Sequence, residues 1–312
     1  MKAIHRSAFG IFAAIIVLFA ALAVFVACST SAMMTEEAER TVKSVVRETT
    51  LRVDRQLLTV EAATRNCAWV VGEHRDDPAY MYRITRRLVE GNEGIVGSAV
   101  AFAPDFYREK GRLYAPYTCI STNGQLKSFS LPYDYSSREW YREVTADGRA
   151  RWCEPYFDEG GGEVMMSTFS VPLTNETGRV YAVLTADVAL SDLSEYISSI
   201  CPYPQSYAVM TSCAGKYLVE PPQGRTIERN ERTMTIREKT ENGWVVSIVC
   251  PMEDILKGTR RLVAFVILFA VIGLLIIIPV SWVHVSRLQR ESVVREWVSN
   301  NLETAAGEGV DR

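Results

Sequence analysis

Four short stretches decide how this chain folds. They read YDYSSREWY (residues 133–141), WCEPYFD (152–158), GGG (160–162) and TADV (185–188). Turn-forming residues separate the segments around them, which predicts a small antiparallel sheet. That sheet carries one arginine, several aromatic side chains and two well-spaced aspartates, the inventory needed to hold a small zwitterion.

The composition limits the class of protein. The chain has 312 residues, of which 48% are hydrophobic and 23% charged, and its formal net charge is −3. This length allows a sizeable core and one or two domains. The near-neutral balance and the lack of a basic stripe argue against nucleic acid as a partner.

Two uncharged segments predict membrane spans. Residues 8–27 and 262–283 contain no charged side chain, and each can cross a hydrocarbon core of about 30 Å at about 1.5 Å per residue. We expect transmembrane helices at 8–28 and 262–285. The alternative for the first is a cleaved signal peptide, or a lipoprotein signal ending at Cys28. Its length exceeds the usual h-region of about 7–15 residues, which favours an uncleaved anchor.

The flanking charges predict the orientation in the membrane. Lysine and arginine occur in residues 1–7 and in the tail 286–312, so the positive-inside rule places both ends in the cytoplasm. Arg260 and Arg261 oppose this assignment from the other side. Residues from about 29 to 258 are then extracytoplasmic, in a two-pass membrane protein.

Residues 29–77 predict a long stalk helix. Apolar residues recur at helical spacing from Met34 to Val70, with charges between them. Thr35 is followed by acidic residues, which suits a helix N-terminus. The helical pattern itself runs from Met33 to about Glu73, which gives a length of about 60 Å, more than a small domain needs. We expect its lower part to pair with a second copy, giving a homodimer, and its upper part to lie on its own sheet.

Residues 78–189 predict a membrane-distal module. Its expected helices are 80–90 and 138–144, and its expected strands are 95–102, 114–120, 125–131, 150–158, 163–173 and 179–188. A linking helix follows within 190–205. A small membrane-proximal module at 206–258 has expected strands at 206–211, 216–219, 232–237 and 243–249. The predicted fold class is α+β, with a long N-terminal helix and two antiparallel sheets between two transmembrane helices.

The cysteines and histidines give no sign of a metal or a catalytic site. None of the seven cysteines has CxxC or CxxH spacing. Cys213 and Cys250 each end a predicted strand and are the favoured disulfide pair, with free buried thiols as an equal alternative. The only histidines are His5, His74 and His284, and no GxSxG, HExxH, P-loop or dinucleotide fingerprint occurs. We expect no catalytic residue, no metal ion and no cofactor.

The candidate site follows from what a free amino acid requires. Arginine binds a carboxylate bidentately, aspartate accepts an ammonium group, and aromatic rings wall the site. By residue type Arg138 is the carboxylate ligand, with Trp140 beside it. The ammonium ligands and the remaining wall are Asp158, Asp187, Tyr133, Tyr141 and Tyr156. The alternative is structural, with the aromatics in the core, Arg138 solvated, and Asp187 capping the linking helix.

These residues resemble the double Cache (dCache) sensor domains of bacterial receptors, whose two sheets are PAS-like. The family pattern is W-Y, W-x-x-P-Y-x-D, S-x-P, G and A-D. Its matches here are Trp140-Tyr141, Trp152 with Pro155-Tyr156 and Asp158, Ser170 with Pro172, Gly178, and Ala186-Asp187. The resemblance covers about residues 33 to 252 and implies a large membrane-distal and a small membrane-proximal sheet.

One subset of the family binds free amino acids through a Tyr, an Arg-x-Trp-Tyr and a downstream Asp. The residues that match in type and order are Tyr133, Arg138, Trp140, Tyr141 and Asp187, and Tyr156 and Asp158 match further lining positions. The resemblance implies that the arginine and tryptophan hold the ligand carboxylate. It implies that Asp187 and the tyrosines hold the amino group. A subpocket for the ligand side chain is expected among Ala99, Ala101, Tyr114, Tyr117, Ser128 and Ser130.

The sequence therefore predicts the sensor part of a bacterial receptor, which binds an L-amino acid and transmits occupancy through the second span. No HAMP, methyl-accepting, kinase or phosphatase pattern follows that span, so we expect a truncated receptor or a tail that signals through a separate cytoplasmic protein. The alternatives are a sensor for an amine or organic acid, and a structural partner protein in which an Arg138–Asp187 salt bridge closes the pocket.

Overall fold

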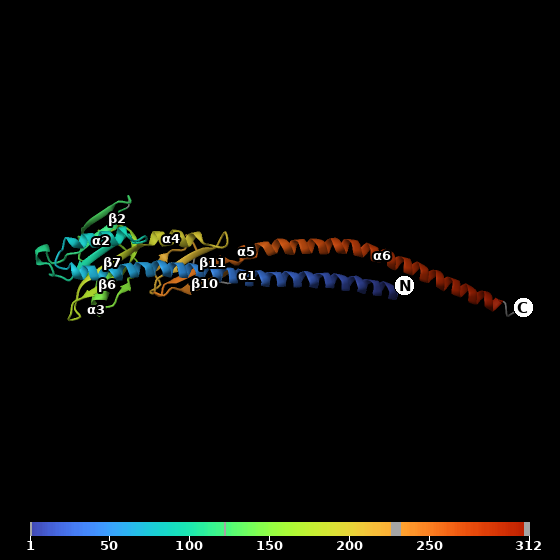
Figure 1. The fold of residues 1–312 in the computed structure, drawn as a ribbon. Helices are drawn as coiled ribbons and strands as arrows, with labels where there is room; N and C mark the ends of the chain where they lie inside the picture. The colour runs from blue at the N-terminus through green and yellow to red at the C-terminus, as the bar shows by residue number, and fades with distance from the viewer. Residues whose placement is uncertain (1, 122, 226–231, 309–312) are drawn as a thin grey trace. The chain divides into compact units, whose positions relative to one another are not determined.

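A computed structural model describes residues 2–121, 123–225 and 232–308 (Figure 1). Its contacts divide the chain into two units. One unit comprises the residues up to Glu37 and those from Ile255 onward, and the other, which we call the sensor unit, comprises Ala38–Asp254.

Two long helices dominate the first unit. Helix α1 (Lys2–Glu73) runs without a break from the first apolar segment into the stalk, and α6 (Lys257–Glu308) contains the second apolar segment. Neither glycine nor proline occurs between residues 11 and 71, which explains the continuity of α1. In the described chain, two helices are long and apolar enough to cross a membrane, Ala13–Glu73 and Lys257–His284, with mean hydropathies of 2.6 and 3.2.

The larger sheet of the sensor unit has seven antiparallel strands. Their order is β3-β2-β1-β7-β6-β4, and β5 also pairs with β6. The strands are β1 (Gly97–Phe102), β2 (Pro116–Ile120), β3 (Leu126–Ser130), β4 (Arg151–Trp152), β5 (Tyr156–Phe157), β6 (Met165–Thr174) and β7 (Val180–Ala189). The single strand predicted at 150–158 is wrong. Pro155 has no N–H to donate, and the chain forms two short strands on either side of it.

The two faces of this sheet have different neighbours because side chains alternate along each strand. Thr118 of β2 bonds Thr85 of α2 (Tyr80–Glu90) at 2.8 Å, which puts α2 on one face. Tyr117, one residue earlier, lies in a cluster with Tyr135 and Trp140 on the other face. That second face is covered by the short helices η2 (Tyr135–Ser137) and α3 (Glu139–Asp147), and η1 (Arg108–Lys110) lies in the β1–β2 connection.

The smaller sheet has four antiparallel strands in the order β10-β11-β8-β9. They are β8 (Tyr207–Thr211), β9 (Tyr217–Val219), β10 (Thr233–Lys239) and β11 (Val245–Pro251). Helix α4 (Leu190–Ser199) links the two sheets, and α5 (Met252–Ile255) leads from β11 to α6. All four strands were predicted from the sequence, with boundaries that differ by up to two residues.

Helix α1 runs along both sheets of the sensor unit (Figure 1). Its apolar side chains at helical spacing are buried, among them Val42, Val46, Val53, Leu57 and Val60. Its polar side chains reach both sheets. Glu61 accepts a hydrogen bond from the Trp152 indole at 2.9 Å, and Asp54 accepts one from the Glu241 backbone at 2.9 Å.

The favoured disulfide pair is also wrong. Cys213 lies in the β8–β9 turn, where its thiol donates to the Asn242 carbonyl at 3.3 Å. Cys250 lies at the other end of β11, opposite Met234. The length of β11 therefore separates the two sulfur atoms.

Candidate ligand-binding site

Two aspartates meet within the large sheet. Asp187 lies in β7 and Asp158 directly follows β5, and only 3% and 4% of their surfaces are exposed. Gly97 of β1 lies opposite Asp187, where a Cβ atom would be 2.5 Å from a carboxylate oxygen. Glycine at this position therefore leaves the room that the Asp187 side chain occupies.

Asp158 is held by neutral donors. The hydroxyls of Tyr133 and Tyr117 donate to its Oδ1 and Oδ2 at 3.1 and 3.3 Å. The backbone N–H of Gly162 donates to Oδ2 at 2.6 Å. Gly161 allows this loop to close, because a Cβ atom there would be 2.1 Å from the same oxygen.

Asp187 is more weakly supported. The Thr168 hydroxyl donates to its Oδ1 at 2.8 Å and lies 2.8 Å from the Tyr156 hydroxyl. Burial, and then repulsion from Asp158, raise the pKa of Asp187 to about 7, although hydrogen bonds from Thr168 and Tyr117 lower it. In the described chain, no lysine, arginine or histidine forms an ion pair with either aspartate.

The tyrosines around the pair stay neutral. Burial raises the pKa of Tyr117, Tyr133 and Tyr156, and the negative charge of the two aspartates raises it further. Each of these hydroxyls is therefore a donor or acceptor at physiological pH and supplies no charge.

Helix α3 contributes an aromatic wall. Trp140 is 4% exposed and stacks with Tyr135 at a centroid distance of 6.2 Å. Tyr141 meets the Tyr135 ring edge-on at 5.3 Å. The indole Nε1 of Trp140 is buried without a hydrogen-bond partner in the described chain. Buried donors are rarely left unpaired, so this one is available to an acceptor that enters the site.

Arg138 is exposed at the N-terminal end of α3. Its guanidinium carbon lies 4.9 Å from the centre of the Tyr133 ring, in a cation–π arrangement. It forms no ion pair with Asp187. The structural alternative, in which an Arg138–Asp187 salt bridge closes the pocket, therefore lacks its expected contact.

A cavity of about 10 Å³ lies between these groups. We call it the aspartate pocket; it is lined by Ala99, Tyr117, Leu131, Tyr133, Trp140, Tyr156, Asp158, Thr168, Thr185 and Asp187. Its volume leaves room for about one water molecule. Five of the seven predicted site residues line it, whereas Arg138 contacts the Tyr133 ring and Tyr141 packs on Trp140 and Tyr135.

The sequence did not predict how Asp158 and Asp187 are hydrogen-bonded. Thr168 and Gly162 bond the two carboxylates, and neither was named as a site residue. The glycine triplet was the available signal for Gly162. Two of the six residues expected to form the side-chain subpocket line the aspartate pocket. Ala99 and Tyr117 line the aspartate pocket, whereas Ser128 bonds Thr118 on the opposite face of the sheet.

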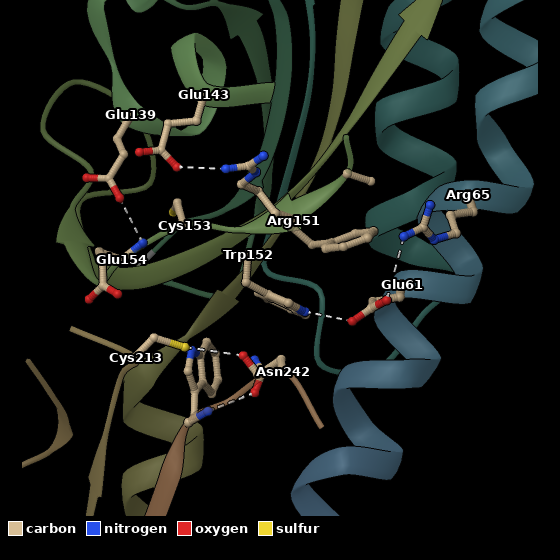
Figure 2. Close-up of a pocket in the computed structure, with 13 residues that line it drawn as sticks. Glu61, Arg65, Glu139, Glu143, Arg151, Trp152, Cys153, Glu154, Cys213 and Asn242 are labelled. Carbon is tan, nitrogen blue, oxygen red and sulfur yellow. Dashed lines mark hydrogen bonds and ion pairs between the residues drawn. The ribbon is translucent and has the colours of Figure 1, made fainter. Parts of the chain in front are cut away.

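A larger cleft of about 430 Å³ lies between the two sheets (Figure 2). Trp152 meets Trp244 edge-on there, with centroids 5.5 Å apart. Its acidic side chains have partners: Glu143 pairs with Arg151 at 3.6 Å, and Glu154 accepts bonds from Ser212 and from the Ala214 amide. No group of three or more His, Cys, Asp or Glu residues in the described chain could hold a metal ion.

Comparisons with known proteins agree with the two-sheet fold. Residues 81–195 match the family model for the methyl-accepting chemotaxis protein-like, first PDC sensor domain. Methyl-accepting chemotaxis protein PctB of Pseudomonas aeruginosa is 29% identical over 100 residues, which cover 31% of this chain and 16% of PctB. The match thus spans only a small part of that curated relative.

Two solved structures show the fold. The extracellular domain of the putative histidine kinase soHK1S-Z6 has a TM-score of 0.59 at 19% identity, covering 72% of this chain and 98% of that domain. The ligand-binding domain of P. aeruginosa PctB in complex with L-Arg has a TM-score of 0.52 at 16% identity, covering 69% and 96%. The chain therefore has the fold of these extracellular domains, the double Cache (dCache) fold, and its residues 81–195 are similar to the first PDC sensor domain of methyl-accepting chemotaxis protein-like proteins.

Proposed function

We propose that this chain is the extracytoplasmic sensor of a two-pass bacterial membrane receptor, and that it binds a free amino acid in the aspartate pocket. The observation that carries the proposal is the pair of buried carboxylates, Asp158 and Asp187, held by neutral donors alone. Burying a carboxylate without a cation is costly, and the raised pKa of Asp187 expresses that cost. A ligand ammonium group between the two supplies the missing charge.

Two donors support a ligand that also has a carboxylate. Trp140 Nε1 is buried, unpaired and part of the cavity wall, and the Arg138 guanidinium lies at the Tyr133 ring. An amine would bind the two aspartates but would offer no acceptor to Trp140 Nε1 or to Arg138. An organic acid would meet two buried negative charges. The amino acid is the ligand class that uses the acceptors and the donors together, and the solved PctB domain was obtained with L-Arg.

Ligand entry requires the pocket to open. Its volume of about 10 Å³ is far below that of an amino acid. The part best placed to move is the glycine loop after Asp158, since Gly160 faces the Tyr133 ring and Gly162 bonds the Asp158 carboxylate. Asp187 lies three residues before α4, so a ligand that draws Asp187 and Asp158 together also acts on the helix linking the two sheets.

The chain acts by binding rather than by catalysis in this proposal, and its output passes to a cytoplasmic partner. The residues from α5 onward connect the small sheet to the second apolar helix by direct continuity of the chain. Differential affinity of the ligand for two arrangements of the sensor unit supplies the free energy of the signal.

The experiment is a ligand panel on the full chain purified in detergent. Thermal unfolding is measured with each of the twenty amino acids, with amines and with organic acids. A ligand at 100 times its Kd adds about 2.7 kcal/mol of stability, a melting shift of about 5–10 °C for a unit of this size. We expect a shift with a subset of L-amino acids. Shifts with amines alone or acids alone contradict the ligand class, and no shift contradicts the proposal.

We also propose that the receptor is a homodimer through α1. Three large apolar side chains on one stripe of this helix are exposed in the sensor unit: Leu51, Leu58 and Trp69, at 57%, 48% and 62%. Their spacing of seven and eleven residues keeps them on one face, as in a helix-to-helix seam.

This dimer is tested by cross-linking the full chain in membranes. Leu58→Glu places a charge in the seam, and we expect it to remove most of the cross-linked dimer. Thr59→Glu introduces the same charge one residue away, at an exposed position off the stripe, and should leave the dimer intact. Equal cross-linking of both variants and the unmodified chain contradicts the α1 interface.

A further inference from the structure

Two cysteines of the smaller sheet lie around one hydroxyl group. Cys201 follows α4, and Cys250 is near the end of β11. The Ser206 hydroxyl lies close enough to both thiols to lower the pKa of each, against the larger effect of burial, which raises it. The strand register agrees, because Tyr207 pairs with Val249 and the next antiparallel pair is Ser206 with Cys250. Two sulfur atoms close to one hydroxyl are close to each other, and Cys201 is also among the groups that raise the pKa of Cys250.

A tight turn fixes this arrangement. The Ser206 amide and hydroxyl both donate to the Tyr203 carbonyl, at 3.0 and 2.6 Å, and the Tyr203 amide donates back to the Ser206 hydroxyl at 3.0 Å. The turn folds the chain that leaves α4 against the end of β11. The Ala208 amide also bonds the Cys201 sulfur, so this thiol is held at the sheet.

We propose that Cys201 and Cys250 form a disulfide bond that staples the end of α4 to β11. The bond forms by exchange with a protein disulfide or a small-molecule disulfide as oxidant. The Cys201 thiolate attacks the oxidant, which releases one thiol and leaves a mixed disulfide on Cys201. The Cys250 thiolate then attacks the Cys201 sulfur, forms the S–S bond and releases the second thiol. Two protons and two electrons leave the cysteines, and the oxidant disulfide is reduced to two thiols.

The bond would stabilise the smaller sheet, whose hydrophobic core is small. Four short strands bury little apolar surface, and the buried cluster at one face is formed by Tyr207, Val209 and Val249. A disulfide between Cys201 and Cys250 closes a loop of about 50 residues that contains all four strands, and loops of this length gain substantially from closure. Burial raises the pKa of both thiols, that of Cys250 to about 12, so exchange is faster before the sheet is fully packed.

The inference rests on the proposed function in one respect: the extracytoplasmic location supplies the oxidising environment. Its test needs no amino acid, so failure of the disulfide and failure of the ligand assignment are distinguished. Cys213 provides the matched control, because it lies exposed in the β8–β9 turn of the same sheet and bonds the Asn242 carbonyl.

The full chain is purified from bacterial membranes without reductant and incubated with oxidised glutathione. Free thiols are then blocked with N-ethylmaleimide under denaturing conditions, and the digest is analysed by mass spectrometry. We expect a peptide that links Cys201 to Cys250 and disappears after reduction. We also expect reduction to lower the melting temperature by about 5–15 °C in the unmodified chain and in Cys213→Ser, but not in Cys201→Ser.

Three outcomes overturn the proposal. One is N-ethylmaleimide on both Cys201 and Cys250 after incubation with oxidised glutathione. Another is glutathione retained on Cys201, since this means that Cys250 does not reach the mixed disulfide. The third is a linked peptide in which either cysteine is joined to a different one. Cys201 is half-buried, so its serine variant is the mutant of choice where loss of the fully buried Cys250 prevents folding.

Discussion

Two cavities of the sensor unit differ in size and in how deeply their carboxylates are buried. The cleft between the sheets has a volume of about 430 Å³, and its carboxylates are partnered by arginine, indole, hydroxyl and amide groups. The aspartate pocket has a volume of about 10 Å³, yet it contains two buried carboxylates without a cation in the described chain. Buried charge without a cation, and not volume, is therefore the ground on which we propose the aspartate pocket as the binding site.

The largest expected effect separates the two cavities by mutation. Asp187→Asn removes one negative charge from the aspartate pocket, so we expect amino-acid affinity to fall by at least about 100-fold, as for a truncated buried charge pair. Glu154→Gln makes the matched change in the cleft, where we expect affinity within about twofold of the unmodified chain. Isothermal titration of both variants measures the difference. The assignment of the cavities is reversed if Glu154→Gln is the more damaging change.

The next effect is on pH dependence. The pKa of Asp187 is about 7 without ligand, so below that pH a proton competes with the ligand ammonium group. We expect affinity to be constant from pH 7 to 8.5 and to fall by about tenfold per pH unit from pH 7 toward pH 4. Titration at each pH measures this slope, and an affinity that does not change between pH 7 and 5 contradicts it.

The same shift predicts how stability depends on pH without ligand. The folded-state pKa of Asp187 lies above the ordinary aspartate value of 3.8, so the folded chain binds its proton more tightly than the unfolded chain. The free energy of unfolding should therefore decrease as pH rises from about 4 to about 7, by on the order of 4 kcal/mol from this group. Asp187→Asn lacks the group, and comparing the two denaturation curves isolates its contribution.

The smallest expected effect concerns the unpaired donor. Trp140→Phe keeps an aromatic ring in the wall and removes the Nε1 hydrogen, which has no partner in the described chain. We expect amino-acid affinity to fall by about fivefold to tenfold, the cost of one hydrogen bond to a charged acceptor. The affinity for the corresponding amine, which has the same side chain but lacks the carboxylate, should not change. A loss shared equally by both ligands would instead assign Trp140 to packing.

Much of the fold could be predicted because its signals are local. The alternation that buries Tyr117 on one face and pairs Thr118 with α2 on the other follows from strand periodicity. The break within residues 150–158 was missed although Pro155 marks it, because the flanking aromatic residues suit a strand. The sequence did not suggest the proposed pairing of Cys201 with Cys250, because Ser206 and Cys250 come together through sheet register, which cannot be read from the sequence.

Residue type indicated which candidate side chains come together, but not the contacts that each of them makes. Asp158 and Asp187 do meet, as two spaced aspartates on one sheet suggested. Arg138 was expected inside the pocket. It is instead exposed at the start of α3, and its guanidinium lies over the ring of Tyr133. The Gly162 amide that holds Asp158 depends on the conformation of a glycine loop, which residue type alone does not specify.

The most direct test of the central claim is to remove the ligand's positive charge while keeping its carboxylate and side chain. The amino acid with the largest thermal shift is compared with its N-acetyl derivative, by isothermal titration against the full chain at pH 8. We predict micromolar or tighter binding of the free amino acid and no measurable binding of the acetylated form, because Asp158 and Asp187 then face no cation. Equal binding of the two would show that the buried carboxylate pair does not hold the ligand.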